Sequence, residues 1–153
     1  MEEEDVRARL VSALEMVAER DLYLLHVDIS ERCIASRLAM YLQQQFPEHH
    51  VDIEYNRDAD TPKKLGLPEE CANFWDSEGR AFVVPDVIVH RRGAGGPNIL
   101  VLELKKSTNL TPRDCDSSRV QAFKDQFNYA FGALIECETR EGHMPEITVS
   151  AWL

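Results

Sequence analysis

Three charged side chains interrupt two strongly apolar segments in the second half of the chain. Asp86 follows a proline in VVPDVIVH, and Glu103 and Lys105 lie two residues apart in ILVLELKK. Charged residues inside otherwise hydrophobic strands break the packing pattern, and such breaks are expected at functional sites. The structural alternative is that the lysines simply end a strand and that Asp86 caps a kink after the proline.

Together these residue types suit the hydrolysis of a phosphodiester bond. Carboxylate oxygens bind Mg²⁺, and the metal activates water and offsets the charge that develops on the phosphate. We therefore expect Asp86 and Glu103 to hold Mg²⁺, for which Mn²⁺ would substitute, with the carbonyl of Leu104 as a further ligand. Lys105 would orient the attacking water or neutralise the transition state.

Two strands and a turn would position this group. Strand side chains alternate between faces, so Glu103 and Lys105 share one face of a strand predicted over 98–106, next to a strand predicted over 81–91 that carries Asp86. The GAGGP sequence between them favours a hairpin reversal, because glycine adopts positive φ readily. Both strands are apolar on both faces, which predicts central positions in a sheet.

Periodicity predicts the remaining elements. Apolar residues at helical spacing indicate helices over 3–20, from 28 or 30 to 46, and over 116–137. Alternation in HVDIEYNR predicts a strand, residues 58–79 form a long loop with a short helical turn, and EITVSAWL closes the chain as a strand. The pattern predicts one mixed α/β domain over 1–153, with a central mixed sheet flanked by helices.

The motif resembles that of a known superfamily. Pro85-Asp86, then sixteen residues, then Glu103-Leu104-Lys105 is similar to the PD-(D/E)XK, or restriction-endonuclease-like, nucleases. The resemblance implies an αβββαβ core, here with an extra N-terminal helix, metal binding by Asp86 and Glu103, and a catalytic role for Lys105. DISER, RLAMYLQQQFP, VDIEYNR and PDVIVHRR also look like segments of small uncharacterised bacterial or phage-type members of this superfamily.

The resemblance also suggests residues outside the motif. A glutamate on the helix before the first core strand often joins the metal site, and Glu31 matches that place and facing. Gln126 and Tyr129 fall on the helix after the lysine, where some exonuclease-like members carry a Gln and a Tyr near the site. For these two residues an ordinary helix face is the alternative.

Further candidates come from position alone. Glu54 either adds to the acidic cluster or faces solvent. Arg91, Arg92 and Lys106 either contact phosphates of a substrate or belong to a solvated edge.

The net charge of −10 opposes a strong unaided grip on a nucleic-acid backbone, which usually meets an excess of Lys and Arg. We therefore expect a metal-dependent nuclease, acting on DNA in preference to RNA, that relies on a homodimer or a protein partner. The alternative is a catalytically weak or inactive nuclease-fold module that binds nucleic acid or a protein.

The four cysteines are scattered and lack the close pairs of a zinc site, so they are interpreted as reduced structural thiols. No apolar run reaches the roughly 20 residues that cross a bilayer. The acidic start shows no secretory signal. These features predict a cytoplasmic protein without membrane contacts.

Overall fold

The computed structural model describes residues 1–57, 61–93 and 95–153. Its helices and strands are α1 (Glu3–Arg20), α2 (Leu22–His26), α3 (Glu31–Gln45), β1 (His50–Ile53), the 3₁₀ helix η1 (Glu69–Cys71), β2 (Phe74–Trp75), β3 (Ala81–Phe82), β4 (Val87–His90), β5 (Asn98–Lys106), α4 (Arg113–Phe127), β6 (Tyr129–Glu138) and β7 (Glu146–Trp152). The mixed α/β class predicted from the sequence is confirmed.

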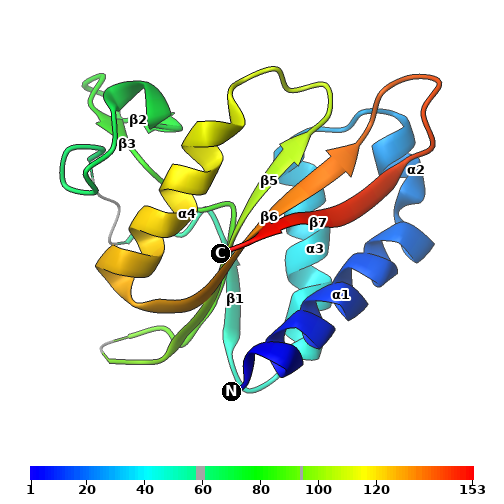
Figure 1. The fold of residues 1–153 in the computed structure, drawn as a ribbon, viewed down its shortest axis with the longest axis horizontal. Helices are drawn as coiled ribbons and strands as arrows, with labels where there is room; N and C mark the ends of the chain where they lie inside the picture. The colour runs from blue at the N-terminus through cyan, green and yellow to red at the C-terminus, as the bar shows by residue number, and fades with distance from the viewer. Residues whose placement is uncertain (58–60, 94) are drawn as a thin grey trace.

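A five-stranded sheet in the order β1-β4-β5-β6-β7 forms the centre of the molecule (Figure 1). All neighbouring strands are antiparallel except β5 and β6, which are parallel. Parallel neighbours need a crossover connection, and α4 is that connection. β4 and β5 each have a neighbour on both sides, as their apolar sequences predicted.

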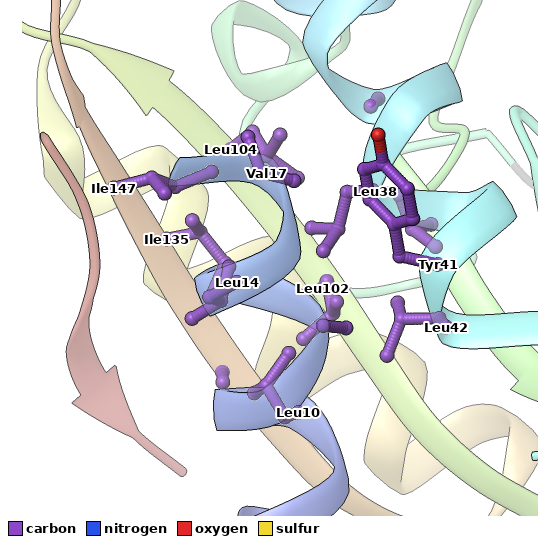
Figure 2. Close-up of a cluster of buried hydrophobic side chains, with 14 of the residues drawn as sticks. Leu10, Leu14, Val17, Leu38, Tyr41, Leu42, Leu102, Leu104, Ile135 and Ile147 are labelled. Carbon is purple, nitrogen blue, oxygen red and sulfur yellow. The ribbon is translucent and has the colours of Figure 1, made fainter. Parts of the chain in front are cut away.

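Helices cover both faces of the sheet: α1 and α3 lie on one face and α4 on the other (Figure 1). Under α1 and α3 the side chains interdigitate in a large apolar cluster (Figure 2). The cluster joins Leu10 and Leu14 of α1 and Leu38 of α3 to Leu102 and Leu104 of the sheet. A smaller cluster under α4 contains Val101, Val120 and Phe123.

The first two predicted helices are confirmed. α1 has the predicted bounds, and acidic residues in its first turn and Arg20 in its last complement the helix dipole. α3 begins after Ser30, whose hydroxyl accepts a hydrogen bond from the backbone N–H of Cys33 at 3.2 Å. Ser30 is therefore the N-cap, which places Glu31 at the first helical position.

The strand predicted over 81–91 is wrong as a single element. It is split into β3 and β4, and Asp86 lies just before β4. The strand predicted over 50–57 is also too long, because Glu54 adopts a positive φ of 46° and ends β1. The backbone N–H of Glu54 donates to the carbonyl of Asp86 at 3.2 Å. Both strands therefore stop where the candidate site begins.

The helix predicted over 116–137 is wrong in its second half. α4 ends at Phe127, its C-cap Asn128 adopts the left-handed conformation with φ 55°, and β6 follows at once. The apolar residues after Asn128 belong to a strand that pairs with β5. β6 is thus the strand after the crossover, and the strand predicted from EITVSAWL is β7, next to it.

The cysteine prediction is wrong for two residues, since Cys71 and Cys115 form a disulfide bond. The loop predicted over 58–79 contains η1 as its helical turn, but also β2; residues 58–60 lie outside the described residues, as does Ala94 of the predicted reversal. In the described part of the chain no helix is long and apolar enough to cross a membrane.

Candidate active site

The candidate residues gather where the C-terminal end of β5 meets the first turn of α4. A cavity of about 280 Å³ there is lined by Glu31, Asp86, Glu103, Leu104 and Lys105. These five are the residues for which the sequence predicted catalysis or metal binding. They come from three parts of the chain: Glu31 from the start of α3, Asp86 from the segment before β4, and the other three from β5.

Glu103 points away from the α1 and α3 face and is held by α4. It is only 2% exposed, and its Oε2 accepts hydrogen bonds from Nη2 of Arg119 at 3.1 Å and from Nε at 3.3 Å. Arg119 also binds Asp116 one turn earlier on α4 and the carbonyl oxygen of Cys71. Among the described residues, Oε1 of Glu103 has no hydrogen-bond partner, although it is fully buried.

Lys105 lies two residues further along the same face. Its ammonium is 3.1 Å from Oδ2 of Asp116 and donates to the hydroxyl of Thr111 at 2.7 Å. The Thr111 hydroxyl in turn donates to Asn109, and the Asn109 amide donates to Glu31 at 3.0 and 3.1 Å. We call this chain of contacts from Glu31 to Glu103, through Asn109, Thr111, Lys105, Asp116 and Arg119, the site network.

Asp86 joins the site through the backbone of β5. Val87 pairs with Leu102, so continuing this antiparallel register places Asp86 opposite Glu103. Its Oδ2 accepts the N–H of Leu104 at 2.7 Å. The N–H and C=O of a strand residue leave the strand on the same side, so the Leu104 carbonyl faces the same edge as Asp86.

The two central carboxyl groups resist ionisation. Loss of hydration raises the pKa of Asp86 to about 7, and the charge of Glu31 raises it further against the lowering effect of the Leu104 N–H. Burial also raises the pKa of Glu103 well above its ordinary value, followed by repulsion from Asp86. Arg119 counteracts both shifts without cancelling them.

A count of charges explains this. The carboxylates of Glu31, Asp86, Glu103 and Asp116 share two cations, Lys105 and Arg119. When all are ionised, the group carries two uncompensated negative charges. An exposed glutamate, Glu70, adds to the acidity at the mouth of the cavity. The site is therefore suited to receive a cation of charge two.

The disulfide closes one side of the site. Cys115 lines the cavity in the first turn of α4, and Cys71 ends η1 in the long segment between β1 and β3. The carbonyl oxygen of Cys71 receives Nη1 of Arg119 at 3.1 Å. Disulfides persist more readily in oxidising compartments than in the cytoplasm, so the cytoplasmic expectation stays a prediction.

Three candidates lie away from the site. Glu54 forms an ion pair with Arg32 at 3.2 Å and does not line the cavity. Gln126 is exposed near the end of α4. Tyr129 is on β6 rather than on the predicted helix, opposite Asn98 at the far end of β5. Gln126 is seven residues further along α4 than Arg119, which holds Glu103, and Tyr129 lies beyond the end of that helix.

The predicted phosphate contacts are also scattered. Arg92 binds Asp52 through both carboxylate oxygens. Arg91 is exposed beside it, beyond the end of β4. Lys106 is next to the site through its backbone N–H, which donates to Glu31 at 2.8 Å, but its ammonium pairs with Asp28 at 3.0 Å.

Sequence reasoning missed Asp116, Arg119, Asn109 and Thr111. A signal was present for the first two, because they are charged residues three apart on the same side of α4 as Val120 and Phe123, which are buried. Asn109 and Thr111 lie in the turn between β5 and α4, where polar residues are ordinary. Nothing in the sequence distinguishes them from solvent-facing turn residues.

Comparison of the chain with models of protein families, with curated proteins and with solved structures finds no match in any of the three.

Proposed function

We propose that the protein is a Mg²⁺-dependent nuclease that hydrolyses phosphodiester bonds, with DNA as its substrate. The observation that carries the proposal is the excess of negative charge around the half-buried Asp86 and the buried Glu103, beside the ammonium of Lys105. Burying uncompensated carboxylates is costly. Their retention at the end of two apolar strands is explained if a divalent cation binds there.

The protein can supply some of the ligands of such an ion, and water would supply the rest. Among the described residues, no three side chains of His, Cys, Asp or Glu are grouped closely enough to hold a metal ion. Mg²⁺, however, retains several waters and binds proteins through one or two carboxylates. Two carboxylates, Asp86 and Glu103 through its free Oε1, lie at one edge of the sheet, and the Leu104 carbonyl offers a further oxygen there. When bound, the ion would polarise the phosphate and activate a water.

The other residues of the site have distinct tasks. Lys105 orients the attacking water or balances charge on the phosphate, and Asp116 and Thr111 hold its ammonium in place. Arg119 fixes one oxygen of Glu103 and leaves the other available. Glu31 anchors the start of α3 to the end of β5 and adds negative charge near Asp86.

The order of the elements also supports the proposal. The run α3, β1, β4, β5, α4, β6 has the αβββαβ order that the PD-(D/E)XK resemblance implies, with β6 as the fourth strand. Asp86 precedes β4, and Glu103 and Lys105 lie on β5, so both parts of the motif are on adjacent strands. The elements outside this order are α1 and α2 before the run, η1, β2 and β3 between β1 and β4, and β7 after it.

The experiment is cleavage of single- and double-stranded DNA and of RNA with Mg²⁺, Mn²⁺ or a chelator. We expect metal-dependent cleavage that falls roughly 100-fold or more in Lys105→Ala, because that lysine acts on the reacting groups. Lys106→Ala is the matched control, since its ammonium pairs with Asp28 outside the cavity. Glu103→Gln should lose cleavage and metal binding together.

Folded wild-type protein that cuts none of these substrates with either metal would refute the proposal. A single site cuts one strand, so cutting both strands of a duplex would require a dimer or a partner. The rate of duplex cleavage against protein concentration tests for that pairing.

One observation favours the alternative of a nuclease-fold module that binds without cutting. Arg119 and Lys105 already pair with Glu103 and Asp116, so the site network is a connected set of contacts. The net charge of −10 would then suit a basic protein partner. Titration with Mn²⁺ separates the two functions, since the module would show no metal binding that depends on Glu103.

A further inference from the structure

A second and larger cavity lies at the opposite end of α4. Its volume is about 680 Å³, within the range of small-molecule pockets. Phe123 and Phe127 of α4 line one part of it, and Ile88 and His90 of β4 and Tyr55 after β1 line another. We call it the α4 C-terminal pocket. It shares no lining residue with the candidate active site.

Aromatic side chains form part of the walls of this pocket. Phe123 and Phe127 are stacked with ring centroids 5.6 Å apart. Tyr55 meets His90 edge to face at 4.7 Å, and Asp52 fixes the His90 ring through a 2.7 Å contact to Nε2. Aromatic faces of this kind hold flat rings by stacking, and nucleic-acid bases are bound in this way without preference for sequence.

Two arginines at the rim are unusual in this protein. Among the described residues, Arg20, Arg57 and Arg91 have no carboxylate partner, whereas every other arginine has one. Arg57 and Arg91 both line the α4 C-terminal pocket. In a chain of net charge −10, two cations left without acidic partners at one cavity mark a place for an anion. The guanidinium fork matches phosphate in particular.

Amides complete the rim. Asn98 donates its side-chain N–H to the carbonyl of Phe127 at 2.6 Å. Asn128, the left-handed residue after α4, also lines the pocket. Such groups can satisfy the polar edge of a base.

We propose that the α4 C-terminal pocket binds one nucleotide, with the base against the aromatic walls and the phosphate at Arg57 and Arg91. The nucleotide is either a free mononucleotide or one unit of a nucleic-acid strand. The first source does not depend on the proposed nuclease function. The second rests on it and would extend it, because the pocket would then position single-stranded substrate.

If the nucleotide belongs to a strand, the spacing of the two sites sets how long the bound strand must be. Asn98 lines the pocket and Glu103 lines the active site, five residues apart on β5. At about 3.3 Å per strand residue they are roughly 17 Å apart. A stacked strand advances about 3.4 Å per nucleotide, so a strand running from Asn98 to Glu103 would span roughly five nucleotides, and fewer where the two cavities adjoin at Pro85 and Asp86.

The test is a titration of the whole protein with adenosine monophosphate in the presence of a chelator, with binding measured by calorimetry or NMR. We expect saturable binding that weakens at least tenfold in the Arg57→Gln/Arg91→Gln variant. Both arginines are exposed, so this variant should fold. Arg20→Gln is the matched control, because Arg20 also lacks a carboxylate partner but lies over Tyr41 on the other face of the sheet. It should bind like wild type.

Further probes separate ring from phosphate. Adenosine should bind more weakly than the monophosphate and be insensitive to the arginine variant, while Phe127→Leu should weaken both ligands several-fold. No saturable binding at millimolar nucleotide, or binding that the arginine variant leaves unchanged, would overturn the proposal.

Oligodeoxynucleotides of three and twelve residues, also with a chelator, distinguish the sources. If the pocket serves a strand, the twelve-residue oligonucleotide binds more tightly than the monophosphate, and the arginine variant removes the difference. If it serves a free nucleotide, the oligonucleotides bind no better than the monophosphate. Because these measurements use no metal and no cleavage, failure of the nuclease proposal would leave their outcome readable.

Discussion

The two faces of the central sheet bury different kinds of side chain. Under α1 and α3 the large cluster is entirely apolar, whereas α4 covers a smaller apolar cluster and, toward its first turn, the buried ion pairs of Glu103 and Lys105. Buried charges contribute little net stability even when paired. The comparison indicates that α1 and α3 provide most of the stability, while α4 covers the buried charged groups and depends on that support.

The largest expected effect is on the α4 face. Arg119→Met should lower the free energy of unfolding by about 3 to 5 kcal/mol, because it leaves Glu103 buried without its cation. Urea denaturation measures the loss. In the double variant Arg119→Met/Glu103→Gln most of the stability should return, since position 103 no longer carries a charge without its partner. A double variant as unstable as the single one would show that packing, and not charge, is the main contribution of Arg119.

On the opposite face, Leu102→Ala should cost about 3 kcal/mol by leaving a void in the large cluster, where Leu102 is fully buried. Mn²⁺ affinity measured on the folded variant should not change. Leu110→Ala is the control, because that side chain is 90% exposed. A change in metal affinity with Leu102→Ala would contradict the separation of the two faces.

The disulfide belongs to the α4 face only. Cys71→Ser/Cys115→Ser should lower the free energy of unfolding by about 2 to 3 kcal/mol, because the bridge links residues 44 apart in the chain. Metal affinity should fall as well, since Cys115 lines the cavity and Cys71 holds Arg119. Cys33→Ser, which changes a free cysteine on α3, should alter neither property.

The smallest effect concerns pH. Folding raises the pKa of Asp86 from 3.8 to about 7, so the native state binds more protons than the unfolded state between these values, and stability must fall as pH rises through that window. In the presence of a chelator we expect the free energy of unfolding to fall by about 1 to 2 kcal/mol. This is less than the whole rise of the pKa from 3.8 to about 7 would give, because Asp86 is only half-buried.

Asp86→Asn should remove this contribution while it keeps an acceptor for the Leu104 N–H. The variant should therefore be more stable than wild type at pH 8 and equal to it near pH 4. Adding Mg²⁺ at pH 8 should stabilise wild type but not the variant. Equal slopes of stability against pH in both proteins would exclude Asp86 as the titrating group.

Much of the candidate active site could be predicted because it depends on local pattern. β5 has the predicted bounds, and alternation along it correctly places Glu103 and Lys105 on one face. Glu31 was suggested by the family resemblance, and the apolar stripe of its helix gave its facing. By contrast, Arg119 reaches Glu103 only because α4 crosses over the sheet, and that crossover follows from β6, which the sequence pattern misassigned.

The misassignment has a physical cause. Phe127, Phe131 and Leu134 are spaced three and four residues apart, which fits a helix, although the last two belong to a strand. Asn128 was the signal that could have corrected it, since asparagine commonly takes the left-handed position after a helix. The disulfide could not be predicted, because nothing in the sequence brings Cys71 and Cys115 together before α4 is placed.

Gly132 in β6 has a consequence for both cavities. A Cβ at this position would lie 2.4 Å from Cγ1 of Val120, so α4 and the sheet are in contact at this point without room for a methyl group. Val120 lies between Arg119, at the active site, and Phe123, at the α4 C-terminal pocket. Any side chain at position 132 would therefore tilt α4 or lift it from the sheet, which would change the depth of both cavities at once. Selection on either cavity would keep this position a glycine.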